Sequence, residues 1–191
     1  MDGMWVCGGL WIAFAVVWLV WAIRTKPTQM REGVSSRLTY SVLTVAAFFS
    51  MFSGDVPRDW LRIRLFPANP WTAVLGVAIT AAGLGFAVWA RAYIGTNWSS
   101  SVTIKRGHEL ITGGPYSLVR HPIYTGLLTG FLGAAIAIAR VSGLVAFALV
   151  FALFWFKLRL EERWMRIQFG EVYAQYAQRV PALVPLLPKI S

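Results

Sequence analysis

The stretch GPYSLVRHPIYTG, residues 114–126, brings an arginine, a histidine and two tyrosines to the start of an apolar segment. Glycine and proline at its beginning prevent a continuous helix, whereas Pro122 suits the first position of the helix that follows. Polar side chains at the mouth of an apolar helix are usually placed there for a function. The stretch therefore predicts a helix that begins at Pro122 with a polar site at its start.

The composition of the whole chain predicts a membrane protein. Of the 191 residues, 57% are hydrophobic and 14% are charged, which leaves too little polar surface for a water-soluble globule. Five apolar segments are long enough to cross a bilayer as helices, or lie near the lower limit. They are Trp5–Ile23, Leu38–Phe52, Trp71–Ala90, Pro122–Ala139 and Ser142–Phe156. The expected fold is an all-α polytopic membrane protein with about five transmembrane helices.

Two connections refine this arrangement. The link Arg140–Gly143 is so short that the last two spans should form an antiparallel helical hairpin. The first span is expected to be retained instead of being cleaved as a signal peptide, because no basic region precedes it and its apolar run is long.

Basic residues predict which side of the membrane each connection faces. The net charge is +10, and Lys and Arg gather after the first, third and fifth spans. By the positive-inside rule these connections lie in the cytoplasm, together with the polar stretch at 114–126. The loop 53–70 opposes this orientation because it carries Arg58, Arg62 and Arg64. We assign the positive charge to topology and anionic lipid, and not to nucleic acid.

Several functional classes are disfavoured. Cys7 is the only cysteine, so neither a disulfide nor a cysteine metal site is expected. The chain lacks the internal repeats and the acidic residues within spans that are typical of transporters. Polar residues gather instead at 97–124 and 157–181. We therefore expect a single membrane domain, residues 1–191, with anchoring spans in 1–95 and a catalytic half in 96–191.

The second polar stretch, residues 157–176, reads KLRLEERWMRIQFGEVYAQY and favours a helix that Gly170 interrupts. It could be a solvated helix that leaves the membrane, or a helix partly covered by the first stretch, since apolar residues wrap around it. Neighbouring residues of a helix point about 100° apart. Only one of the two glutamates is therefore expected to face a pocket. We expect it to be Glu161, which lies one turn beyond Lys157 at the end of the hairpin, while Glu162 should form a surface pair with Arg166.

The first stretch also has a purely structural interpretation. His121 would cap the helix, Arg120 would extend to lipid phosphate, and Tyr116 and Tyr124 would be interfacial aromatic residues. For any single residue this interpretation is as good as a functional one. It becomes the weaker interpretation when both polar stretches are considered together.

The motifs GPYSLVRHPIYTG and EERWMRIQFGEVYAQYAQRVP, separated by one apolar hairpin, resemble the isoprenylcysteine carboxyl methyltransferase family. The resemblance covers residues 108–181 and extends to phospholipid methyltransferases and, more distantly, to membrane sterol reductases. It implies a methyltransferase that uses S-adenosylmethionine and acts on a hydrophobic acceptor, such as an isoprenoid carboxylate or another lipid. A membrane reductase that uses NADPH and a non-catalytic membrane protein remain the alternatives.

The resemblance also implies binding residues, although it assigns neither a catalytic residue nor a metal ligand. The implied cofactor-binding residues are His108, Glu109, Leu110, Ile111, Tyr116, His121, Pro122, Ile123, Tyr124 and Glu161. A basic residue near the end of the last span would bind the substrate carboxylate. Lys157 occupies this position with Arg159 nearby, whereas the family has an arginine, whose planar fork lysine cannot reproduce.

The chemistry of these residue types suits methyl transfer. A glutamate can bind the amino group of the cofactor, tyrosine rings can face its adenine and sulfonium, and His121 can donate to its carboxylate. Positioning and exclusion of water can then supply most of the rate. A carboxylate acceptor is ionised near pH 7 and needs no base, whereas an amine or thiol would need His108, His121 or a glutamate. The acceptor is expected to enter sideways from the bilayer.

Overall fold

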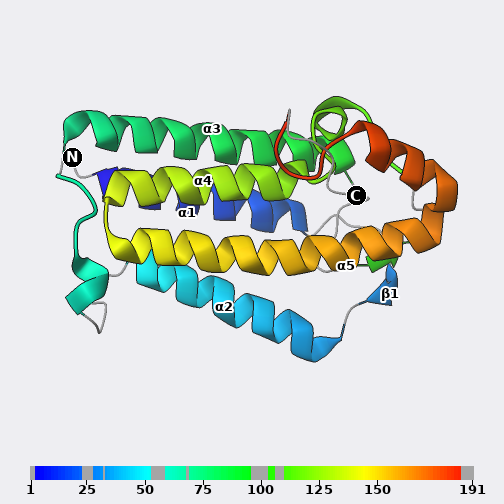
Figure 1. Cartoon of the computed structure of the whole chain (residues 1–191), viewed down its shortest axis with the longest axis horizontal. Helices are drawn as coiled ribbons and strands as arrows, with labels where there is room; N and C mark the ends of the chain where they lie inside the picture. The colour runs from blue at the N-terminus through cyan, green and yellow to red at the C-terminus, as the bar shows by residue number, and fades with distance from the viewer. Residues whose placement is uncertain are drawn as a thin grey trace.

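The computed structural model describes residues 3–22, 28–31, 33–52, 59–67, 69–95, 103–105 and 110–185. Its helices are α1 (Gly3–Ala22), α2 (Val34–Phe52), α3 (Pro70–Ile94), α4 (Pro122–Ile138) and α5 (Val141–Arg179). Figure 1 shows them as an elongated bundle in which successive helices run in opposite directions. The predicted all-α polytopic fold is therefore confirmed, and α1, α3 and α5 are long and apolar enough to cross a membrane.

The predicted hairpin of the last two spans is present. α4 ends at Ile138, the left-handed backbone of the next residue, Ala139 (φ 55), turns the chain, and Arg140 precedes α5. Beyond its apolar half, α5 continues as a polar helix that is interrupted at Gly170, as predicted, where the backbone is not helical (φ 51, ψ -125), and it then resumes as far as Arg179. The polar stretch is thus a helix that leaves the apolar region.

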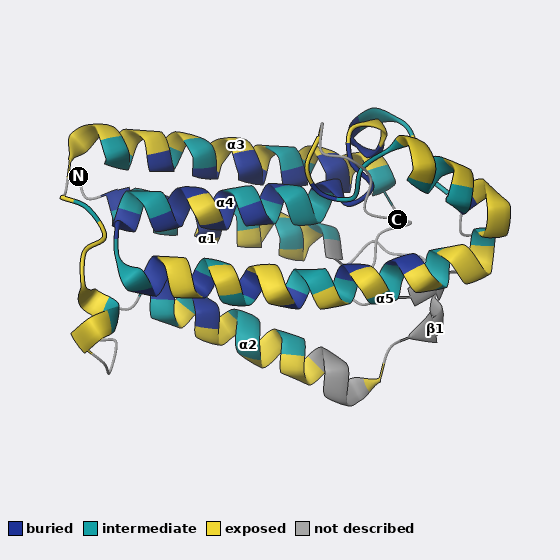
Figure 2. Ribbon diagram, viewed as in Figure 1, coloured by how far each residue is buried: buried dark blue, intermediate teal, exposed yellow. Residues whose placement is uncertain are grey.

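An aromatic cluster holds three helices together on the inside of the bundle. Trp11 of α1, Phe48 of α2 and Phe131 of α4 lie with their ring centroids 4.7 to 4.9 Å apart. Such pairs are more favourable than their buried area alone implies. Figure 2 shows the buried residues on the facing sides of the helices and the exposed residues on the outside, where lipid would lie.

Glycines allow α3 and α4 to touch through their backbones. A Cβ atom on Gly83 of α3 would lie 2.6 Å from the carbonyl oxygen of Gly126 on α4, and one on Gly126 would lie 2.5 Å from the oxygen of Gly83. Small residues permit this approach in membranes, where helix association depends on close packing. The position of α4, and of the polar residues before it, is thereby fixed against α3.

A small antiparallel ribbon, which the sequence did not predict, joins two connections at one end of the bundle. It consists of β1 (Thr28–Arg31), which follows α1, and β2 (Thr103–Lys105), which follows α3. α2 diverges from α5 towards this same end (Figure 1). The polar stretch before α4 also lies there.

Candidate active site

The chain before α4 turns the polar side chains of the first stretch inwards. A 3-10 helix, η3 (Gly114–Ser117), precedes α4, which begins at Pro122 as predicted. His121 occupies the cap position of α4, but its side chain makes no capping hydrogen bond. Arg120 is buried and does not extend to the lipid surface. The purely structural interpretation therefore fails for these two residues.

The centre of the site is a buried ion pair between Arg120 and Glu162. The guanidinium donates from Nε and Nη2 to Glu162 Oε1 at 2.8 and 2.6 Å, and the two side chains are only 2% and 4% exposed. Burial raises the pKa of Glu162, but the hydrogen bond and charge of His121 and of Arg120 outweigh it and hold the pKa at about 2. Glu162 is therefore ionised at neutral pH.

Both glutamates of α5 approach His121, which corrects the sequence-based expectation. Nε2 of His121 lies 3.3 Å from Glu162 Oε1, and Nδ1 lies 3.8 Å from Glu161 Oε2. The predicted pair between Glu162 and Arg166 does form, at 3.6 Å, but Glu162 is not a surface residue. The expectation that only Glu161 points towards the pocket is wrong, because the imidazole lies between the two carboxylates.

Glu161 has a different environment from that of its neighbour. It accepts a hydrogen bond from the hydroxyl of Tyr124 at 2.9 Å, and its side chain is 30% exposed. The ring of Tyr124 stacks against His121, with centroids 5.6 Å apart, and against Phe154 of α5 at 5.0 Å. A ligand could therefore reach Glu161, whereas the oxygens of the buried Glu162 are already engaged by Arg120, His121 and Arg166.

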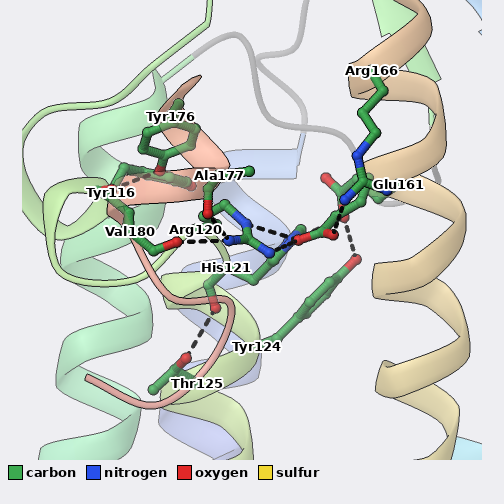
Figure 3. A network of polar contacts seen from close by, with 11 residues as sticks. Tyr116, Arg120, His121, Tyr124, Thr125, Glu161, Arg166, Tyr176, Ala177 and Val180 are labelled. Carbon is green, nitrogen blue, oxygen red and sulfur yellow. Dashed lines mark hydrogen bonds and ion pairs between the residues drawn. The ribbon is translucent and has the colours of Figure 1, made fainter. Parts of the chain in front are cut away.

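The segment after α5 folds back over the start of α4, as Figure 3 shows. Arg120 Nη1 donates to the carbonyl oxygens of Ala177 and Val180 at 2.9 and 2.6 Å, at the end of α5. Thr125 donates its hydroxyl proton to the carbonyl oxygen of Leu183 at 2.7 Å. Arg120 thus joins Glu162 and the last turn of α5 to the mouth of α4, a role that the sequence did not indicate.

Two tyrosines near the end of α5 complete the cluster. Tyr176 donates to the carbonyl oxygen of Tyr116 at 2.6 Å, which ties α5 to η3. Tyr173 is 2% exposed, and its hydroxyl has no hydrogen-bond partner within the part of the chain that the structure describes. Burial raises the pKa of Tyr173, so its hydroxyl stays protonated. Sequence reasoning missed Tyr173, although its i,i+3 spacing from Tyr176 places both on one helix face.

Four of the remaining predicted cofactor-binding residues lie in the described segment 110–123. Leu110 and Ile111 are partly buried in the segment that leads to η3, and Pro122 and Ile123 form the start of α4. His108 and Glu109 lie outside the described residues.

The two predicted substrate-binding residues do not lie together. Lys157 lines a groove of about 310 Å³ between α2 and α5, with Tyr40 and Thr44 on one wall and Leu153 and Phe154 on the other. Arg159 lies elsewhere on α5, with its guanidinium carbon 5.2 Å from the ring centroid of Trp155. Lys157 is therefore placed beside a space that an acceptor could occupy.

Comparison with known proteins identifies the kind of enzyme. Residues 71–172 match the phospholipid methyltransferase family. Protein-S-isoprenylcysteine O-methyltransferase B of Arabidopsis thaliana is 31% identical over 160 residues, covering 80% of this chain and 81% of that protein. The corresponding enzyme of Schizosaccharomyces pombe is 35% identical over 97 residues, or 49% of this chain and 41% of that enzyme.

A third relative has a different name. The cobalt-zinc-cadmium resistance protein CzcN of Cupriavidus metallidurans is 35% identical over 131 residues, covering 66% of this chain and 59% of that protein. Within the described ranges, no group of three or more His, Cys, Asp or Glu could hold a metal ion. The Arabidopsis enzyme is matched over most of its length, and the family model matches more than half of this chain. The chain therefore belongs to the isoprenylcysteine carboxyl methyltransferase family of membrane methyltransferases.

Proposed function

We propose that this membrane methyltransferase binds S-adenosylmethionine beside Glu161 and His121 and methylates a hydrophobic acceptor that carries a carboxylate. The main support is that the groove between α2 and α5 is joined to the charged cluster by side chains in direct contact. Phe154 lines the groove between α2 and α5 and stacks on Tyr124, whose hydroxyl donates to Glu161. A lipid-soluble and a water-soluble reactant could therefore meet at Tyr124.

The groups present fit the cofactor. When bound, S-adenosylmethionine would supply a methyl group attached to a positively charged sulfur. The acceptor would bond to the methyl carbon as the bond from that carbon to sulfur breaks. The partly exposed carboxylate of Glu161 can bind an ammonium group, and the hydroxyl of Tyr124, which donates to it, holds that carboxylate in place. The buried hydroxyl of Tyr173 is a donor still to be satisfied. These side chains would hold and orient the reactants and exclude water from them.

The groove favours an acceptor with an apolar chain and an anionic group. Leu153, Phe154 and Val45 offer apolar contact along the groove, while the ammonium of Lys157 supplies a positive charge beside them. A carboxylate is ionised at neutral pH and needs no general base. This suits a site in which Glu162 is already engaged by Arg120.

We also propose that this end of the molecule faces the cytoplasm. The polar extension of α5 carries Arg163, Arg166 and Arg179 and lies at the end of the bundle that holds the cluster. The excess of Lys and Arg in the connections expected at this end supports the orientation through the positive-inside rule.

Ligand binding by the purified full chain tests the function. Labelled S-adenosylmethionine should bind saturably, with an affinity in the usual micromolar to millimolar range of enzyme substrates, whereas NADPH should not. Methyl transfer should be detected to an S-prenylated cysteine with a free carboxylate and not to its methyl ester. Phosphatidylethanolamine, tested separately as an amine acceptor, should not be methylated. Binding of NADPH without binding of S-adenosylmethionine would instead indicate a reductase.

Tyr173 should contribute to cofactor binding and not to folding. Tyr173→Phe removes a hydroxyl that has no partner in the described structure, so the melting temperature should be unchanged or slightly raised. We expect the affinity for S-adenosylmethionine to fall about tenfold, as for the loss of one hydrogen bond. Tyr176→Phe is the matched control, because it breaks the bond to Tyr116 and should lower stability. Unchanged affinity in Tyr173→Phe would remove this residue from the proposed site.

A further inference from the structure

The opposite end of the bundle contains a second cavity, far from the candidate active site along the helices. Its volume is about 380 Å³, and it lies between the starts of α1 and α3 and the turn that joins α4 to α5. Met4, Ala73 and Ile138 give it an apolar side, and Arg64 and Arg140 give it a strongly basic one. No acidic residue is among those that line it in the described structure.

The two arginines face each other across a short backbone pairing. Arg64 and Arg140 form an isolated antiparallel bridge. The amide of Leu65 donates to Ala139 at 2.9 Å, and that of Val141 donates to Ile63 at 3.0 Å. These bonds flank the arginines, so they form a non-hydrogen-bonded pair, the arrangement in which opposed side chains are closest.

Two like charges in directly opposed positions destabilise a structure unless a counter-charge lies between them. Neither guanidinium of this pair has a hydrogen bond or ion pair with another described residue. The backbone bonds on either side keep the two side chains rooted at directly opposed positions. An anion in the cavity that both side chains line would offset this repulsion, and a guanidinium binds phosphate oxygens through two parallel hydrogen bonds.

We infer that this cavity binds the phosphate of an anionic phospholipid in the membrane leaflet opposite the active site. Trp5, Trp60 and Trp71 are exposed at this end of the bundle, which places the cavity at the level of an aromatic belt and of lipid headgroups. The apolar side of the cavity suits the glycerol and the first methylenes of a lipid, which inorganic phosphate lacks. The inference also explains why loop 53–70 is basic on the side where few basic residues are expected.

Lipid titration of the purified protein in a neutral detergent tests this site. Phosphatidylglycerol should raise the melting temperature by roughly 4 °C or more at saturation, and phosphatidylcholine should raise it less. In the double variant Arg64→Gln/Arg140→Gln, the midpoint of the phosphatidylglycerol titration should move at least about tenfold higher. Arg64→Lys/Arg140→Lys, which keeps both charges, should retain part of the affinity.

The matched control is Arg179→Gln, which removes an exposed arginine at the other end of the bundle. Its phosphatidylglycerol titration should equal that of the unmodified protein. The inference fails if Arg64→Gln/Arg140→Gln responds to phosphatidylglycerol as the unmodified protein does, or if no lipid shifts the melting temperature. An equal shift with inorganic phosphate would overturn the assignment to lipid. Because the cavity is remote from Glu161, these results leave the methyltransferase proposal unaffected.

Discussion

Glu162→Gln should lower the free energy of unfolding by about 3–5 kcal/mol, the usual cost of removing one partner of a buried ion pair. The guanidinium of Arg120 would keep its bonds to the carbonyls of Ala177 and Val180 but would have no carboxylate opposite it. For a chain of this length such a loss corresponds to a fall in melting temperature of the order of 10 °C. Thermal unfolding of the purified full chain in detergent measures it.

The matched control is Glu161→Gln, one residue away on the same helix. It weakens a single hydrogen bond from Tyr124 at a partly exposed position, so the loss of stability should be about 1 kcal/mol. Binding of S-adenosylmethionine should nevertheless be strongly reduced, because the proposed ligand for its ammonium loses its charge. Equal melting temperatures of the two variants would show that the buried pair does not stabilise the fold.

The ion pair of Glu162 should also make the free energy of unfolding depend on pH in the acid range. The pKa of Glu162 in the folded protein, about 2, is below its ordinary value of 4.5. The ion pair therefore makes its full contribution to stability above pH 4.5. The contribution is lost as the pH falls from 4.5 towards 2. The stability difference between the unmodified protein and Glu162→Gln should therefore shrink across this window.

Hydropathy predicted the fold because a bilayer imposes a minimum length on each apolar helix. Pro122 begins α4 as predicted, since proline lacks the N–H that a first helical residue cannot use within the helix. Periodicity, however, gives only the angle between Glu161 and Glu162 and not the orientation of α5 relative to α4. That orientation depends on packing, and it placed His121 between the two carboxylates.

Other features depend on partners that no local pattern reveals. The segment after α5 docks on α4 through backbone groups, which every residue possesses, so its sequence carries little sign of the contact. The buried state of Arg120 follows from this docking together with Glu162. The role of Tyr173 depends on the absence of a partner among the described residues, which only the folded structure can show.

Gly83→Ala should be among the most disruptive single-methyl changes in the chain. A Cβ atom there would lie 2.5 Å from the amide nitrogen of Gly130 and 2.6 Å from the oxygen of Gly126. These are backbone atoms, so the contact can be relieved only if α3 and α4 move apart. Overpacking of this kind costs about 3 kcal/mol, and the interface has little but close packing to hold it.

Gly85→Ala, two residues along α3, provides the control for this change. A Cβ atom on Gly85 meets nothing within 4 Å, and alanine favours a helix over glycine by about 1 kcal/mol. Its melting temperature should be unchanged or higher, whereas that of Gly83→Ala should fall by roughly 6–12 °C. Because His121 immediately precedes α4, Gly83→Ala should also weaken binding of S-adenosylmethionine, even at temperatures where the protein is folded. Equal melting temperatures for the two variants would mean that α3 and α4 are not held by backbone contact.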